Sequence, residues 1–110
     1  MSKRGKTRYR LSTVRSTYEE AMGIKDGMIE FEGAKGETYK IPHPAFLDSD
    51  QQAELDVLTT PEQIVAWFLG EEQYKTFVKN DNDHDDFGLL LNAIGAEFRE
   101  KSERVKLPRF

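Results

Sequence analysis

The sequence contains no cysteine, and that absence removes two kinds of site. Without thiols the chain can form no disulfide and can bind no metal through thiolates. Such a composition is typical of proteins of a reducing cytosol. Only two histidines are present, His43 and His84, and they belong to no ligand spacing known for zinc. We therefore expect no metal site built on Cys or His.

Long apolar segments are also missing. The longest apolar run, Ile64 to Leu69, has six residues, whereas a helix that spans a bilayer needs about 20. The N-terminus is polar and basic and lacks the apolar stretch of a signal peptide. We therefore expect a soluble cytoplasmic protein that has no membrane among its partners.

Recognised catalytic motifs are absent as well. The sequence has no nucleophile elbow, phosphate-binding loop or dinucleotide-binding fingerprint. Asp81, Asp83 and Asp85 have the spacing of the first three ligands of a calcium loop. Asp86 stands where that loop needs glycine, however, and Asn92 stands where it needs glutamate. We interpret these aspartates as a solvated helix cap, and we expect no catalytic residue, no bound metal, no cofactor and no enzymatic activity.

Acidic side chains are missing from residues 1–15, which carry six basic ones, whereas residues 16–110 carry ten basic and twenty acidic side chains. We interpret residues 1–15 as a flexible basic arm, residues 16–104 as one helical domain, and residues 105–110 as a C-terminal tail. The arm contains a cluster that would gain affinity for a polyanion by releasing counterions: Lys3, Arg4, Lys6, Arg8 and Arg10. A solvated arm is the commoner case, so we do not favour nucleic acid as a partner.

A change in the spacing of the apolar residues near Met28 predicts a β-hairpin. Ile29 and Phe31 alternate with glutamates, and Tyr39 and Ile41 continue the alternation after a glycine-containing loop. The hairpin is expected over residues 28–41. Because a lone hairpin is barely stable in water, its apolar face is expected to lie on helices.

Helix signals flank the hairpin. A first helix is expected from Ser16 or Thr17 to Gly23, whose lack of a side chain suits a helix end. A second is expected to start at Asp48 or Ser49 and to run through Leu58.

The richest apolar stretch, Thr60–Val78, starts with a capping box that pairs Thr60 with Gln63. Gly70 is expected to divide it into two short helices. A final helix from about Asp86 to Arg99 has the most regular apolar stripe, which consists of Phe87, Leu90, Leu91, Ile94 and Phe98. The expected fold is mainly α with a small β-hairpin (α+β), in which four to five short helices pack around the hairpin.

Aromatic residues are more numerous after Phe46 than one small core needs, and aromatic side chains are the usual anchors of interfaces. Trp67 and Phe68 are neighbours on a helix, so they lie about 100° apart around its axis. Phe68 shares its direction with Ile64 and is expected in the core. We predict a partner-binding patch that consists of Trp67, Tyr74, Phe77 and Phe46. The alternative, that these rings are simply the core, stays open.

One resemblance covers a little over half of the chain. The hairpin leads into Ile41-Pro42-His43-Pro44, and the later features are Phe46-Leu47-Asp48, Gln51-Gln52, Leu69-Gly70-Glu71-Glu72-Gln73-Tyr74 with Phe77, a polar loop, and a closing helix with Leu89-Leu90-Leu91-Asn92-Ala93-Ile94. With this pattern the run from Glu37 to Phe98 resembles the tail assembly chaperones of long-tailed (siphovirus-type) phages that infect actinobacteria.

The resemblance implies a non-enzymatic assembly factor that coats the long helical tape measure protein, keeps it soluble and helps recruit tail tube subunits. Such a factor acts in the host cytoplasm and leaves before the virion is complete. Self-association into a homo-oligomer is compatible with the pattern. Two alternatives stay open: a phage structural subunit that is retained in the virion, and a small nucleic-acid-binding protein that acts through its basic arm.

Overall fold

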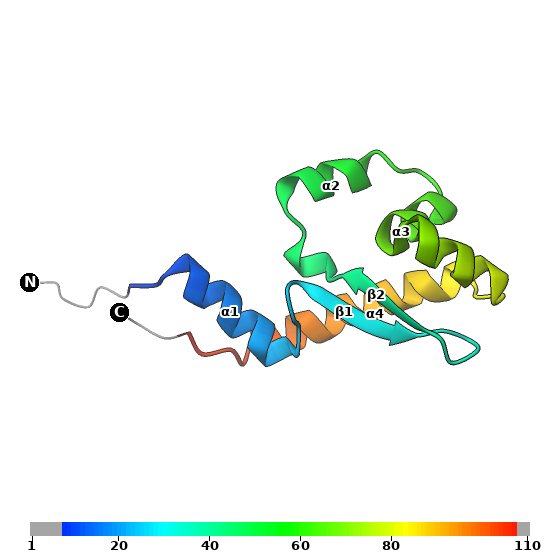
Figure 1. Ribbon diagram of the computed structural model, residues 1–110. Helices are drawn as coiled ribbons and strands as arrows, with labels where there is room; N and C mark the ends of the chain where they lie inside the picture. The colour runs from blue at the N-terminus through cyan, green and yellow to red at the C-terminus, as the bar shows by residue number, and fades with distance from the viewer. Residues whose placement is uncertain (1–7, 108–110) are drawn as a thin grey trace, which may run out of the picture.

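The computed structural model describes residues 8–107, and Figure 1 shows their arrangement. The elements in chain order are α1 (Leu11–Met22), β1 (Met28–Glu32), β2 (Thr38–Pro42), the 3-10 turn η1 (Pro44–Phe46), α2 (Ser49–Asp56), α3 (Pro61–Lys79) and α4 (His84–Ser102). Four α-helices and one two-stranded sheet within residues 8–107 confirm the predicted α+β fold. None of these helices is long and apolar enough to cross a membrane.

The hairpin follows the predicted alternation. β1 and β2 pair antiparallel, with Ile29 opposite Ile41 and Phe31 opposite Tyr39. These four side chains share one face of the sheet because successive residues of a strand point to opposite faces. That face is the one turned toward the helices, since Tyr39 and Ile41 are only 2% and 0% exposed.

The core lies between the hairpin and the facing sides of α3 and α4. Its buried side chains are Tyr39, Ile41, Val65, Phe68, Leu69, Phe77 and Phe87. The ring of Phe77 packs edge to face on Tyr39 at 5.8 Å and on Phe87 at 6.1 Å, the arrangement that aromatic pairs prefer. The predicted position of Phe68 in the core is confirmed.

α3 begins and bends where the sequence predicts. The Thr60 hydroxyl accepts the N–H of Gln63 at 3.2 Å, and the Gln63 side chain accepts the N–H of Thr60 at 3.3 Å, which confirms the capping box. Gly70 has φ 78° and ψ 164°, a conformation that is essentially restricted to glycine. The segment is therefore two helical halves joined at a kink.

α1 begins earlier than the sequence suggests. Its first residue is Leu11, and Arg10 precedes it without a side-chain cap. The hydroxyls of Ser16 and Thr17, the expected caps, instead donate to the carbonyl of Thr13 at 3.1 and 2.7 Å inside the helix. Residues 11–15 of the predicted arm are therefore helical and belong to α1.

The rest of the predicted arm falls partly outside the described chain. Lys3, Arg4 and Lys6 lie outside the described residues, as do residues 108–110 of the predicted C-terminal tail. The predicted end of α1 is confirmed, because Gly23 follows the helix with φ 69°. In Figure 1, α1 lies beside the C-terminal end of α4, and the rings of Tyr18 and Phe98 stack at 6.0 Å.

The bounds of α2 and α4 differ from the expected ones by two or three residues. α2 starts after Asp48, whose side chain accepts the N–H of Gln51 at 2.8 Å, and ends at Asp56 rather than Leu58. α4 starts earlier than Asp86 because Asp83 accepts the N–H of Asp85 at 2.7 Å, and it continues to Ser102.

Candidate partner-binding surface

The structure does not bring the four aromatic residues of the predicted patch together. Phe77 is 2% exposed and belongs to the core, so in this fold it offers no ring to a partner. Trp67 and Tyr74 are half-buried and lie on opposite sides of the Gly70 kink. Phe46 lies in η1, with its ring against Phe98 at 5.9 Å.

Trp67 connects two helices. Its indole Nε1 donates to the Glu54 carboxylate of α2 at 2.9 Å, and its ring packs edge to face on Phe68 at 5.0 Å. Trp67 is half-buried, so part of its surface stays exposed beside these contacts.

Tyr74 closes the corner between α3 and α4. Its hydroxyl forms a hydrogen bond of 2.9 Å with Nε2 of His84, the first residue of α4. The His84 ring also lies 5.6 Å from the ring of Phe77. Tyr74 is thus held by an internal contact.

Phe46 belongs to a separate aromatic cluster. The guanidinium of Arg15 lies 5.1 Å from the centre of its ring. The His43 ring packs on Phe46 at 5.3 Å and on Phe98 at 5.7 Å. Burial lowers the pKa of His43, whose Nδ1 accepts the N–H of Ala45 at 3.0 Å. This cluster fastens α1 and η1 to the end of α4.

A mostly apolar groove lies between the first halves of α3 and α4. It encloses about 440 Å³, and its apolar lining comes from Pro61, Ile64, Val65, Phe87, Leu89 and Leu91. Leu89 is 65% exposed, although it lies in the most apolar stretch of α4. The wall is also open at Gly88, where no atom lies within 4 Å of the place that a Cβ would take.

Sequence reasoning missed Leu89, although a signal was present. Leu89, Leu90 and Leu91 are consecutive, and consecutive helical residues point about 100° apart. A helix that packs on one side cannot bury all three. The structure half-buries Leu90 and Leu91 and leaves Leu89 outside.

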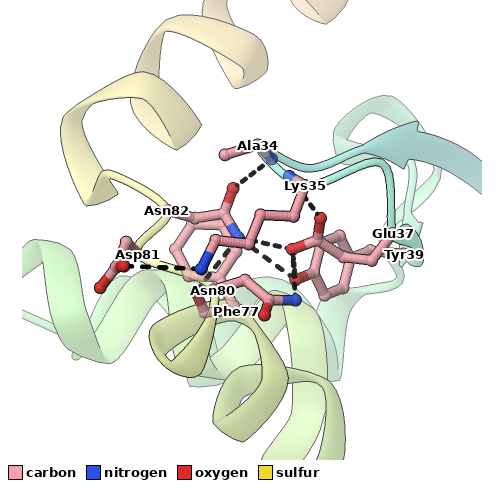
Figure 2. Close-up of polar contacts among 8 residues, drawn as sticks. All are labelled: Ala34, Lys35, Glu37, Tyr39, Phe77, Asn80, Asp81 and Asn82. Atoms are coloured by element: carbon pink, nitrogen blue, oxygen red, sulfur yellow. Dashed lines mark hydrogen bonds and ion pairs between the residues drawn. The ribbon is translucent and has the colours of Figure 1, made fainter.

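A polar network lies between the hairpin loop and the α3–α4 connection (Figure 2). The carboxylate of Glu37 accepts hydrogen bonds from the Tyr39 hydroxyl at 2.6 Å, from Asn80 at 2.8 Å and from Asn82 at 2.9 Å. The Asn82 side chain in turn accepts the N–H of Ala34 at 2.8 Å. The network therefore ties the hairpin loop to the connection between α3 and α4.

The network also shifts two pKa values. The hydrogen bond from Tyr39 is the largest cause that lowers the pKa of Glu37 to about 2. Burial, together with the neighbouring carboxylate, raises the pKa of Tyr39 to about 12. At neutral pH the pair is therefore a carboxylate and a protonated phenol, which suits a structural contact.

The aspartates of the α3–α4 connection have structural contacts as well. Asp83 caps α4, and the carboxylate of Asp81 lies 3.7 Å from Nζ of Lys35. Within residues 8–107, no group of three or more His, Cys, Asp or Glu side chains is placed to hold a metal ion.

Comparison with known proteins gives no match: no protein-family model, curated protein or solved structure is similar to this chain. What the chain does is therefore inferred from its own residues.

Proposed function

We propose that the protein is a tail assembly chaperone of a long-tailed phage, which binds the tape measure protein and helps recruit tail tube subunits. The sequence pattern between Glu37 and Phe98 motivates this proposal, and the α3–α4 groove is the structural observation that carries it. A tape measure protein is a long amphipathic helix, and such a helix aggregates unless its apolar stripe is covered. An apolar groove between two helices is a common receptor for one.

The groove offers the chemistry that such a helix needs. Ile64 and Leu91 supply half-buried apolar walls, and Leu89 supplies an exposed apolar contact. Trp67 follows Ile64 by three residues on α3, so it lies on the neighbouring turn of the same side. Of the four predicted partner-binding residues, Trp67 is therefore the one that we retain as an anchor.

The edge of the groove is acidic. Asp85 lines it, and Glu62 is exposed in the first turn of α3. A helix whose apolar stripe is flanked by Lys or Arg would therefore be favoured over an acidic one. The proposed chaperone works in the host cytoplasm and leaves before the particle is complete.

The test is co-expression with the tape measure protein encoded by the same genome. We expect the tape measure protein to become soluble and to co-purify with the wild-type chain. Leu89→Asp should abolish this effect, because it places a charge in the groove. Leu11→Asp is the matched control, since Leu11 is 88% exposed at the start of α1, where an acidic residue is tolerated.

Four results would contradict the proposal. If the tape measure protein stays insoluble in the presence of folded wild-type chain, the proposed function is wrong. If capture survives Leu89→Asp, the groove is not the binding site. Binding of the chain to a DNA oligonucleotide that weakens steeply between about 0.1 and 0.5 M salt would instead indicate phosphate contacts and a nucleic-acid role. Detection of the chain in purified virions by mass spectrometry would indicate a retained structural subunit.

A further inference from the structure

The outer edge of β1 is open, and the hairpin's hydrogen bonds show which groups it presents. The N–H of His43 donates to the carbonyl of Gly27 at 2.8 Å, and the N–H of Gly33 donates to the carbonyl of Glu37 at 2.7 Å. Hydrogen-bonded and non-hydrogen-bonded pairs alternate along an antiparallel ladder. The Glu30–Lys40 pair is therefore non-hydrogen-bonded, and the backbone groups of both residues point away from the hairpin.

The two strands differ in what covers these outward groups. On β2, the side chain of Gln73 accepts the N–H of Lys40 and donates to its carbonyl, both at 2.8 Å. On β1, the N–H and C=O groups of Glu30 and Glu32 have no protein partner within residues 8–107, where the sheet has only two strands. α3 thus closes one edge of the sheet and leaves the other available for pairing.

Side-chain burial shows the same asymmetry. Tyr39 and Ile41 are fully buried, whereas Phe31 and Ile29, their cross-strand neighbours on the same face, are only half-buried. The helices therefore cover the inner face of the sheet under β2 and leave it partly uncovered under β1.

An apolar trough lies between this open edge and α4. Two cavities of about 350 and 270 Å³ share Leu90 of α4 as a common wall. Phe31 and Phe87 line the first cavity, and Ile29 and Ile94 line the second. Figure 1 shows β1 running across α4 at this place. The trough therefore follows the strand and has room for side chains from an added neighbour.

The rim of the trough is acidic. Its exposed charged residues are Glu30, Glu32, Asp81, Asp83, Asp86 and Glu97, and no Lys or Arg of residues 8–107 lines either cavity. A second copy of β1 would place its own Glu30 and Glu32 against these residues. Like charges on paired strands are unfavourable, so the rim disfavours self-pairing and favours a basic occupant.

We propose that the open edge of β1 and the adjoining trough bind an extended segment of another protein by strand addition, and that this segment alternates apolar residues with Lys or Arg. Its apolar side chains enter the trough over Leu90, and its basic side chains point outward beside Glu30 and Glu32. The site shares only the buried Phe87 with the lining of the α3–α4 groove, and it does not depend on the function proposed for that groove.

The first test uses an eight-residue peptide in which lysine alternates with valine, labelled for fluorescence anisotropy. Glu30→Pro removes the outward N–H of Glu30 and keeps the ladder with β2, because that N–H does not face β2. Glu30→Ala is the matched control, since it removes the same side chain and keeps the N–H. We expect Glu30→Pro to bind about tenfold more weakly than Glu30→Ala. Equal affinities in two variants with equal melting temperatures would overturn the proposal.

The second test leaves the protein unchanged. In an added strand only alternate amides face β1, so N-methylation of one alternate set should weaken binding about tenfold, and methylation of the other set should have little effect. Equal effects of the two sets would overturn strand addition. A peptide that alternates glutamate with valine should not bind. A concentration-dependent dimer that Glu30→Pro abolishes would show that a second copy occupies the edge, which would also overturn the proposal.

Discussion

The Tyr39 hydroxyl donates a hydrogen bond of 2.6 Å to the carboxylate of Glu37, which lies two residues earlier in the chain, just before β2. Tyr39 is a buried core residue, and the same carboxylate oxygen also accepts the amides of Asn80 and Asn82. One ionised group therefore connects the sheet, the core and the connection that orients α4.

This contact predicts a specific acid sensitivity. The pKa of Glu37 falls from 4.5 to about 2 in the folded protein, so the native state binds fewer protons than the unfolded chain. The stabilisation is complete above about pH 4.5 and is lost as the pH falls toward about 2. Glu37→Gln should be less stable than the wild type at neutral pH, and urea unfolding should show this deficit shrinking between those pH values. A deficit that stays constant with pH would contradict the assignment.

Tyr39 predicts that the folded protein loses stability as the pH rises, the opposite direction to the effect of Glu37. Burial first, and then the carboxylate of Glu37, raise its pKa from 10.0 to about 12. The stabilisation is therefore complete below about pH 10 and is lost as the pH rises toward 12. Tyr39→Phe should lose the phenol titration step near pH 12 in absorbance, and Glu37→Gln should move that step to lower pH. A step that Glu37→Gln does not move would mean that burial alone shifts the pKa.

The sequence predicted the elements that have local signals. Thr60 with Gln63, Asp48, Gly23 and Gly70 mark helix ends or breaks through chemistry within a few residues. The start of α1 has no such signal, because Arg10 provides no side-chain cap. That helix packs on α4 through Tyr18 and Phe98, and this contact could not be found from local sequence.

The candidate site was less predictable from the sequence because it also depends on contacts between elements, which local patterns do not indicate. Helical periodicity placed Trp67 and Phe68 relative to each other, but it could not be carried across the Gly70 kink to Phe77. The kink changes the direction of the second half of α3, and Phe77 turns into the core. The network joins Glu37 to Asn80 and Asn82, which lie 43 and 45 positions later in the sequence. No local sequence pattern indicates such a contact.

The kink itself gives a prediction about Gly70. Its φ of 78° is unfavourable for any residue with a Cβ, although no atom within 4 Å would obstruct one. Gly70→Ala should therefore cost about 1 to 3 kcal/mol of unfolding free energy through backbone strain alone. Gly88→Ala is the matched control, since Gly88 is helical and equally unobstructed. It should stabilise the protein by about 0.5 to 1 kcal/mol in urea unfolding. Equal effects of the two substitutions would show that α3 is not bent at Gly70.

The adjacent rings of Phe68 and Trp67 give the test that separates core from surface. Phe68 is 4% exposed and packs on Phe87 at 5.8 Å, so Phe68→Ala should cost about 3 to 5 kcal/mol. Trp67 is half-buried, so Trp67→Ala should cost clearly less in urea unfolding. Glu54→Ala removes only the acceptor of the indole N–H and should cost no more than about 1 kcal/mol.

Trp67 and Glu54 also allow a test of partner binding. If Trp67 anchors the tape measure protein beside the α3–α4 groove, Trp67→Ala should weaken that complex by about 2 kcal/mol or more, as loss of an interface hot spot does. Glu54→Ala is the control here, because it leaves the indole ring in place and should bind almost as well as the wild type. Isothermal titration on variants that are folded by circular dichroism would measure both effects. Should Trp67→Ala unfold the protein as severely as Phe68→Ala, the Trp67 ring belongs to the core. The exposed Leu89 side chain and the half-buried Ile64 and Leu91 then remain as the groove's candidate contacts.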